Sequence, residues 1–361
     1  MGWVEKQVPF NTIDTYNVFR SCSDDYKFRT KLMLKKGQFY FHTSTPPGRL
    51  VFGMRFKQMM CPLALIAASL PDVSFIANLW SLDNPGTVSD TKCYEGLDGN
   101  LGYSYCPPPF CNSSLVIPSG DTVRANTHAL EKLAPGTPFR EKRIVGWRGS
   151  LSGHRPMRYD GSPLWRTTTA RQLLLNKCSR DSRMDCAVVN GSRRLSHVEL
   201  QNSFRGLIAV AGYSYAGNFA DALYYHDTVP LRQDVPAVAW YEPFFEADKH
   251  YLALNRNLSD LEDKVNALFD IRSTDRMLAI SENGRQRAKH VFSYEFQKQH
   301  FTSLFMRYAH ALRGSFFDDD DGAWKPVSLS HCPSSTRTTP KTHMLSTLWR
   351  QLAKQFGINM R

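Results

Sequence analysis

The stretch Leu207-Ile208-Ala209-Val210-Ala211 runs directly into Gly212-Tyr213-Ser214-Tyr215-Ala216-Gly217-Asn218, and these twelve residues decide the fold. The five apolar residues predict a buried β-strand, and small and aromatic residues form the loop after it. A helix-like segment follows at 219–225, and Thr228-Val229-Pro230-Leu231 predicts a second strand. Strand, Gly-containing loop, helix and strand form a βαβ unit, in which ligands bind at the carboxyl end of the strand. The pattern alone says only that a site could lie here.

The same alternation of strands and helices continues on both sides of this stretch. Ser259-Asp260-Leu261-Glu262 reads as a capping box, which indicates the start of a helix. Apolar runs predict strands at 38–42, 73–79, 102–105 and from 115, and helical periodicity predicts helices at 55–70, 167–175, 259–269, 275–290 and 293–312. This order favours an α/β fold with parallel sheets in two lobes.

Breaks in the pattern divide the chain into four parts. Ala134-Pro135-Gly136-Thr137-Pro138 is the clearest punctuation, and we expect the boundary between the lobes there. Beyond residue 313 an acidic run and a Ser/Thr/Pro-rich run predict a flexible tail, within which 347–356 could form a short basic helix. The expected parts are an extension at 1–24, an N-terminal lobe at 25–138, a C-terminal lobe at 139–313 and the tail at 314–361.

Charge and composition narrow the class of protein. The 361 residues are 42% hydrophobic and 22% charged, close to a globular average, which favours a folded chain over a disordered one. The net charge of +12 fits a nucleic-acid binder, a membrane-surface binder or an enzyme with an anionic substrate. The basic residues are spread out and no nucleic-acid-binding signature occurs, so we expect no nucleic-acid partner. No apolar run is long enough to span a bilayer, and no signal peptide is visible, so membrane association would need a missing N-terminal segment.

The eight cysteines do not decide between an oxidising and a reducing cell compartment. Cys106/Cys111 and Cys178/Cys186 are close enough in sequence to close small loops, and the sequons at Asn112, Asn190 and Asn257 give weak support to a lumenal protein. The alternative is a set of free, mostly buried thiols in a reducing compartment.

Several motifs occur in an order that resembles one enzyme family. In the second half these are Trp147-Arg148-Gly149-Ser150 followed by Arg171, the stretch 207–231, Trp240-Tyr241-Glu242-Pro243, His250-Tyr251, Leu258-Ser259-Asp260-Leu261 and Glu282-Asn283-Gly284. In the first half they are Leu70-Pro71-Asp72-Val73, Asp83-Asn84-Pro85 and Leu115-Val116-Ile117-Pro118. Over about 25–312 the chain is similar to the protein O-glucosyltransferase and capsule-xylosyltransferase family of lipopolysaccharide-modifying-type glycosyltransferases.

The resemblance implies a function and a fold. It implies two Rossmann-like lobes facing across a cleft (GT-B-like), with the acceptor on the N-terminal lobe and the sugar nucleotide on the C-terminal one. The implied reaction is inverting transfer of glucose or xylose from a UDP-sugar to a hydroxyl of a protein or glycan, in the endoplasmic reticulum or Golgi lumen. Asp83 matches the family's base, although an Asp before Asn-Pro is commonly a turn former. No Asp-x-Asp stands in an obvious donor loop, so we expect no obligatory metal and no cofactor.

The donor's diphosphate needs positive charge and N–H groups. By the resemblance, the residues expected to supply them are Arg148, Gly149, Ser150, Arg171, Gly212, Ser214 and Asn218. Structural alternatives stand beside them: Arg148 could pair with a neighbouring acid, and Arg171 could be an exposed helix residue. His250, Tyr251 and Trp240 are better explained as packing residues.

The chain departs from the family in the loop after the central strand. Where the family has an acidic residue, a Ser and an Arg that meets the diphosphate, this chain has Ala211, Ala216 and Asn218. Loss of that Arg could cost a few kcal/mol of binding. Either Arg205 or Arg232 substitutes for it, or the protein is an inactive relative that binds a glycan or a protein.

Overall fold

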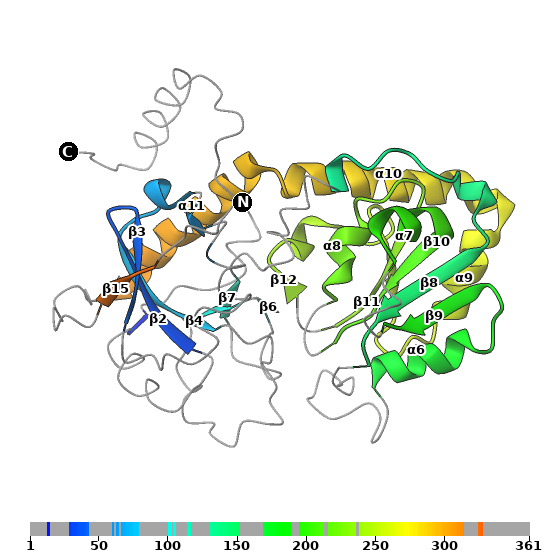
Figure 1. Cartoon of the computed structure of the whole chain (residues 1–361), viewed down its shortest axis with the longest axis horizontal. Helices are drawn as coiled ribbons and strands as arrows, with labels where there is room; N and C mark the ends of the chain where they lie inside the picture. The colour runs from blue at the N-terminus through cyan, green and yellow to red at the C-terminus, as the bar shows by residue number, and fades with distance from the viewer. Residues whose placement is uncertain are drawn as a thin grey trace. The chain divides into compact units, whose positions relative to one another are not determined.

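The strand predicted from Leu207 is the centre of a five-stranded parallel sheet (Figure 1). The computed structural model describes residues 13–14, 29–42, 60, 63–64, 66–78, 100–102, 104–105, 114–116, 130–151, 169–189, 195–212, 216–235, 238–313 and 324–327. The sheet has the order β13-β11-β10-β8-β9. Its strands are β8 (Ile144–Gly149), β9 (Met184–Val188), β10 (Phe204–Ala209), β11 (Val229–Gln233) and β13 (Leu252–Leu254).

This strand order places a switch point between β8 and β10. Numbered along the chain, the strands lie in the order 2-1-3-4-5, so the connections leave β8 and β10 in opposite directions. In open parallel sheets ligands bind at the carboxyl ends of the two strands that flank such a point. The α/β prediction with a Rossmann-like C-terminal sheet is confirmed.

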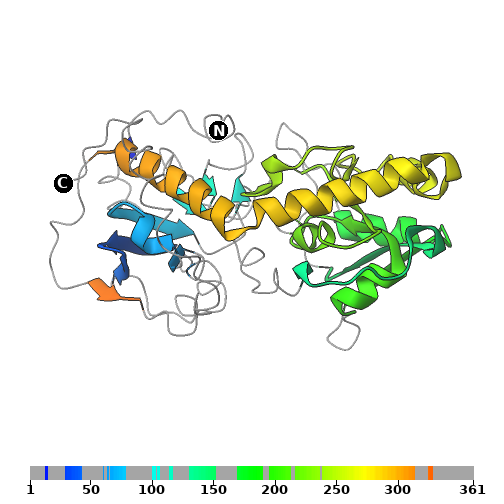
Figure 2. The ribbon, with the colours of Figure 1, turned by 90° about the horizontal axis from the view of Figure 1, so that it is seen from above.

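Helices cover both faces of this sheet because the side chains of β10 alternate between them. Ile208 packs in one hydrophobic cluster with α6 and α9, whereas Leu207 and Ala209 belong to another with α8. In Figure 2, α10 runs lengthwise beside the sheet. The helices around this sheet are α6 (Ala170–Cys178), α7 (His197–Ser203), α8 (Asn218–Ala222), α9 (Leu261–Phe269) and α10 (Thr274–Val291), with short 3-10 turns η3 (Phe139–Glu141), η5 (Glu242–Phe244) and η6 (Ile271–Ser273). The helix α11 (Tyr294–Ala311) follows α10 and lies beside the sheet of the first half in Figure 1.

The first half of the chain forms a mixed sheet, so the expectation of parallel strands throughout was wrong there. Its order is β15-β3-β2-β4-β5-β7, and only the pairs β4-β5 and β5-β7 are parallel. β2 and β3 form a hairpin because Lys36 and Gly37 both have positive φ (50° and 75°), as a type I′ turn requires. The strands are β2 (Arg29–Lys35), β3 (Gln38–His42), β4 (Val73–Asn78), β5 (Asn100–Gly102), β7 (Ser114–Val116) and β15 (Trp324–Pro326), with η1 (Ala67–Ser69) before β4.

Four shorter strands pair outside the two large sheets. They are β1 (Ile13–Asp14) with β14 (Leu312–Arg313), and β6 (Ser104–Tyr105) with β12 (Val238–Ala239).

The lobe boundary at residue 138 stays a prediction.

The predicted flexible tail is wrong at one place. Trp324–Pro326, which lies within 314–361, forms β15 and pairs with β3. Pro326 is tolerated because β15 is an edge strand, where a missing N–H breaks no ladder bond. Val327 donates its N–H to the Phe39 carbonyl at 2.8 Å and is buried. The helix expected at 347–356 lies outside the described residues.

The predicted capping box at Ser259 is also wrong. Asp260 is the N-cap of α9, and its carboxylate accepts from the N–H of Asn255 at 2.8 Å instead of capping the helix. The capping box lies at α7, where Ser196 Oγ accepts from the N–H of Glu199 and the Glu199 carboxylate accepts from the N–H of Ser196. The Ser-x-x-Glu spacing is shared by both sites, so the spacing alone does not show which of them caps its helix.

Candidate functional site

Arg171 reaches the switch point of the sheet. It lies in the first turn of α6, which starts there because the Thr169 hydroxyl accepts from the N–H of Gln172 at 3.1 Å. Its Nη1 donates to the carbonyl and hydroxyl oxygens of Ser150, just after β8, at 2.9 and 3.2 Å. Its Nη2 donates to the carbonyl of Val210, just after β10, at 3.5 Å. One guanidinium therefore joins the carboxyl ends of both flanking strands.

Two glycines leave room for this arrangement. A Cβ on Gly212 would stand 2.7 Å from Arg171 Nη2, and one on Gly149 would stand 2.5 Å from the ring of Trp147. The Trp147 ring lies 5.9 Å from the Arg171 guanidinium. Because neither position carries a Cβ, the Trp147 ring can lie against Gly149 and the Arg171 guanidinium can lie against Gly212. The structure thus brings together four of the expected donor residues: Gly149, Ser150, Arg171 and Gly212.

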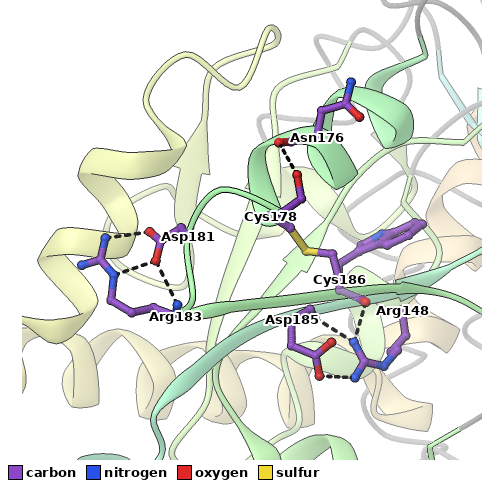
Figure 3. Close-up of a disulfide and its surroundings, with 9 residues drawn as sticks. Arg148, Asn176, Cys178, Asp181, Arg183, Asp185 and Cys186 are labelled. Atoms are coloured by element: carbon purple, nitrogen blue, oxygen red, sulfur yellow. Dashed lines mark hydrogen bonds and ion pairs between the residues drawn. A yellow bond between two sulfur atoms is a disulfide. The ribbon is translucent and has the colours of Figure 1, made fainter.

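Arg148 points elsewhere. Its guanidinium donates to the Asp185 carbonyl at 2.7 Å and to the Asp185 carboxylate at 2.5 Å, on the neighbouring strand β9 (Figure 3). It also lies 5.0 Å from the centre of the Phe204 ring, and its side chain is 16% exposed. The structural alternative, a pair with a neighbouring acid, is therefore what the structure shows. A role for Arg148 in donor binding stays a prediction.

Asn218 uses its amide to hold the central loop in place. Its Nδ2 donates to the carbonyl of Ile208 at 3.2 Å, which ties the start of α8 to the end of β10. Where the family that the sequence resembles has an Arg, this chain has a neutral donor directed at its own backbone. Ser214 and Asp83 lie outside the described residues, so their expected roles stay predictions.

Arg205 does not substitute for the missing cation. It lies at the amino end of β10, opposite the switch point, and donates to the carbonyls of Phe139, Arg140 and Leu268 at 3.0, 2.9 and 3.2 Å. Arg205 therefore does not reach a ligand at the carboxyl ends of the strands, because it lies at the amino end of β10. The prediction that Arg205 substitutes for the missing cation is wrong.

Arg232 is on β11 and is neutralised already. Its guanidinium forms a buried ion pair with Glu242 of η5. Burial raises the pKa of Glu242, although Arg232 and the N–H of Ala239 act in the opposite direction. Binding of a phosphate by Arg232 would require this pair to separate, so substitution by Arg232 is not supported.

Gln233 is a site residue that the sequence did not suggest. It ends β11, is 1% exposed, and its Oε1 accepts from the N–H of Ala211 at 3.1 Å. Its Nε2 donates to the carbonyl of Arg256 at 2.7 Å. One buried amide therefore fixes the loops after β10 and β13 relative to each other. The available signal was a polar residue at the end of an apolar strand, which is common and unspecific.

Trp240, His250 and Tyr251 are packing residues, as expected. Trp240 is fully buried among Tyr241, Phe292 and Phe301. His250 Nδ1 accepts from the N–H of Glu246 at 2.8 Å, and burial lowers the pKa of His250. Tyr251 packs edge-on against Phe219, with ring centres 5.2 Å apart.

A metal site is not found in the part of the chain that the structure describes: no three His, Cys, Asp or Glu side chains gather there. Among the helices of those same residues, none is long and apolar enough to cross a membrane.

Of the two alternatives that the sequence leaves open for Cys178 and Cys186, the structure shows the bonded one. A disulfide joins them and links the end of α6 to β9 (Figure 3). Cys106 and Cys111 lie outside the described residues.

Comparison with protein-family models finds no match, and comparison with curated protein sequences finds none either. Among solved structures the chain is similar to a glycosyltransferase from Rickettsia africae, with 9% identity and a TM-score of 0.32, over 61% of this chain and 65% of that one. It is also similar to sucrose-phosphate synthase from Thermosynechococcus elongatus, with 13% identity and a TM-score of 0.34, over 61% of this chain and 60% of that one. This chain thus spans less than two thirds of either structure. Both similarities are partial and concern the fold, so the functional argument rests on the chain's own residues.

Proposed function

We propose that this chain is an inverting glycosyltransferase that moves glucose or xylose from a UDP-sugar to a hydroxyl of a protein or glycan. The observation that carries the proposal is the position of Arg171 at the switch point, between the ends of β8 and β10. The order of the chain's motifs, which resembles the O-glucosyltransferase and capsule-xylosyltransferase family, supplies the identity of the donor.

The chemistry explains why a cation belongs at this place. A diphosphate carries negative charge, and the leaving UDP gains more as the glycosidic bond breaks. The N-terminus of α6 and the Arg171 guanidinium both favour negative charge at the carboxyl edge of the sheet. The contact of Nη1 with Ser150 lies on the solvent-exposed side, where a phosphate can approach. Arginine also offers five N–H donors in a planar fork, which suits phosphate oxygens.

The proposed reaction needs one base. The acceptor's hydroxyl oxygen attacks the anomeric carbon from the face opposite UDP, the bond from that carbon to the UDP oxygen breaks, and the hydroxyl proton passes to a carboxylate. Attack from the opposite face inverts the anomeric carbon. Asp83 is the carboxylate we propose, on the strength of the Asp-Asn-Pro motif alone. Neither a metal nor a cofactor is part of the proposal.

The proposal includes a lumenal compartment, the endoplasmic reticulum or the Golgi. The disulfide between Cys178 and Cys186 supports it, because disulfides persist in oxidising compartments and are rare in the cytosol. The family resemblance supplies the particular organelles. The partners we propose are the UDP-sugar and a protein or glycan acceptor, without nucleic acid.

Calorimetry with UDP tests the donor site. Arg171→Ala should weaken UDP binding about 10- to 100-fold, since a charged hydrogen bond contributes about 1.5–3 kcal/mol. Arg180→Ala is the matched control, because Arg180 is exposed just after the same helix and should leave UDP affinity unchanged. Asp83→Asn should keep UDP affinity and lose sugar transfer. Equal transfer by Asp83→Asn and the unmodified protein would defeat the proposed base.

A second candidate function is a non-catalytic relative that binds a glycan or a protein. The observation that favours it is Asn218, whose amide is directed at the Ile208 carbonyl where the family has a phosphate-binding Arg. This candidate predicts no UDP binding by the unmodified protein in the same calorimetry. If the protein binds UDP and this binding depends on Arg171, the chain has a donor site and this second candidate is excluded.

A further inference from the structure

Asn257-Leu258-Ser259 is an acceptor sequon for N-linked glycosylation in the C-terminal half. Of the three sequons it is the one that the structure describes, whereas Asn112 and Asn190 lie outside the described residues. It follows β13, in the turn that leads to α9. A sequon of this kind arises often by chance, so its value depends on the geometry and the compartment.

The turn buries the middle residue of the sequon and exposes the other two. Leu258 has a positive φ of 54° and is 0% exposed, inside the cluster that covers one face of the sheet. Its N–H donates to the Asn255 carbonyl at 2.8 Å, which closes the turn. Asn257 and Ser259, on either side of it, are both exposed. The buried Leu258 therefore anchors the turn while its two polar neighbours face solvent.

The oxygen of the Asn257 side-chain amide is hydrogen-bonded, whereas its nitrogen is not bonded to any described residue. Its Oδ1 accepts from the N–H of Ser259 at 3.1 Å. Its Nδ2, the atom to which a sugar is attached, makes no hydrogen bond with any residue in the described ranges. A glycan on Nδ2 would therefore displace no contact that the described fold uses. The Ser259 hydroxyl accepts from Asn255 Nδ2 at 3.0 Å, so the neighbouring Asn255, unlike Asn257, is committed through its amide nitrogen.

An independent observation points to the compartment in which this modification occurs. The disulfide between Cys178 and Cys186 joins α6 to β9, away from the sequon in sequence. Disulfide formation and N-linked glycosylation share the same oxidising, secretory environment. The sequence leaves both features open, and the structure shows a bonded Cys178 and Cys186 and an exposed Asn257.

We propose that Asn257 carries an N-linked glycan. The Asn257 Nδ2 forms a bond to the anomeric carbon of an oligosaccharide that is supplied as a polyprenyl diphosphate. The bond from that carbon to the diphosphate oxygen breaks, the polyprenyl diphosphate leaves with the electron pair, and Nδ2 gives up one proton. No oxidation or reduction takes place.

The glycan would follow the carboxyl end of the outer strand of the sheet. β13 is at the edge of the sheet, with β11 and β10 between it and β8. Asn257 immediately follows Arg256, whose carbonyl accepts from Gln233. Asn257 therefore lies at the same carboxyl edge of the sheet as Arg171, with two strands between β13 and β8, and its amide makes no contact with the described residues that hold Arg171. The inference does not rest on the proposed function, because UDP binding and glycan attachment are measured separately.

The test uses the full chain, secreted from a eukaryotic cell behind a cleavable signal peptide. Peptide mass spectrometry after enzymatic N-glycan release in ¹⁸O-labelled water should show Asn257 converted to labelled Asp. Asn257→Gln and Ser259→Ala should each abolish the glycan at this position. Ser259→Thr should keep it, because Asn-x-Thr is also a sequon. Asn255→Gln, at a neighbouring Asn outside any sequon, should leave the glycan in place. Site-resolved peptides separate Asn257 from Asn112 and Asn190.

Two results would overturn the proposal. One is recovery of the Asn257 peptide without label from secreted protein in which Cys178 and Cys186 are bonded. The other is a label on Asn257 that persists in Ser259→Ala, which would indicate spontaneous deamidation. UDP calorimetry on Asn257→Gln should match the unmodified protein, and a failure of UDP binding in both would count against the proposed function while leaving the glycan intact.

Discussion

The Arg232 guanidinium pairs with the Glu242 carboxylate while both side chains are almost fully buried, at 10% and 4% exposure. Arg232 belongs to β11 and Glu242 to η5, so the pair fastens the segment after β12 to the sheet. The Glu242 Oε1 also accepts from the N–H of Ala239 at 3.2 Å, and the Arg232 guanidinium lies 5.7 Å from the centre of the Phe219 ring. This region therefore depends on two opposite charges that water does not reach.

Removing one charge of this pair should be costly. Glu242→Gln leaves Arg232 buried without its counter-charge, and we expect a loss of about 3–5 kcal/mol in the free energy of unfolding, measured with urea. Replacing both residues, with Arg232→Met and Glu242→Leu, should recover most of that loss. Asp270→Asn, in the exposed pair with Arg272, is the control and should have little effect. A Glu242→Gln protein as stable as the control would mean that the pair does not hold the fold.

A buried lysine at the amino end of the sheet predicts a pH dependence. Lys142 donates to the carbonyls of His226 and Asp227 at 3.2 and 2.7 Å and to the Thr228 hydroxyl at 3.1 Å. Burial lowers the pKa of Lys142 from 10.5 to about 8, an effect that Asp227 opposes and Arg205 reinforces. Between these two values the unfolded chain binds more protons than the folded one, so stability rises with pH across that window.

The experiment compares Lys142→Met with the unmodified protein from pH 8 to pH 10.5. As pH rises, the free energy of unfolding of the unmodified protein should increase by up to about 3 kcal/mol relative to that of Lys142→Met. Each pKa unit corresponds to about 1.36 kcal/mol. Lys132→Met, at an exposed position nearby, should follow the unmodified protein at every pH. Parallel pH profiles for Lys142→Met and the unmodified protein would contradict the prediction.

The disulfide should contribute measurably to stability. It closes a short loop, with eight residues of separation, and connects the helix that carries Arg171 to β9. In the chain-entropy account, a loop of this size contributes about 2–3 kcal/mol, so replacing both cysteines with Ser should lower the free energy of unfolding by that amount. Cys178→Ser alone should match the double variant in urea unfolding, since either change removes the bond. A double variant as stable as the unmodified protein would show that the bond is not formed in solution.

The sequence predicted those parts of the site that depend on local pattern. The stretch from Leu207 to Leu231 predicts the central parallel strands, and the family resemblance predicts a donor-site role for Arg171, which the structure shows at the switch point. Apolar periodicity and turn residues act over a few positions, so they can be recognised in one sequence.

What the sequence left undecided depends on contacts between distant residues. Arg148 is bound by Asp185, 37 positions away, and Gln233 connects Ala211 to Arg256 across two loops. The hairpin at Lys36-Gly37 was missed because Lys is an unusual residue at positive φ. A basic or amide side chain can take many partners, and only the strand order decides which of them is near. This is why the residue types of the site could be predicted while their individual roles could not.

Gly212 offers the sharpest test of the site. A Cβ at this position would stand 2.7 Å from Arg171 Nη2, closer than real Cβ contacts, so Gly212→Ala should displace the guanidinium. We expect UDP affinity to fall about as far as in Arg171→Ala, roughly 10- to 100-fold, because the charge is no longer held at the strand ends. The long side chain can give way at its far end, so the loss in stability should be small.

A double-mutant cycle separates displacement of Arg171 from a general disturbance of the loop. In Arg171→Ala the guanidinium is absent, and adding Gly212→Ala should then weaken UDP binding no further. Both affinities are measured by calorimetry, with urea unfolding of each variant to show that the fold is retained. Additive losses in the double variant would mean that Gly212 acts on the ligand through its own backbone rather than by leaving room for Arg171, and the site would then depend on the loop rather than on the guanidinium it surrounds.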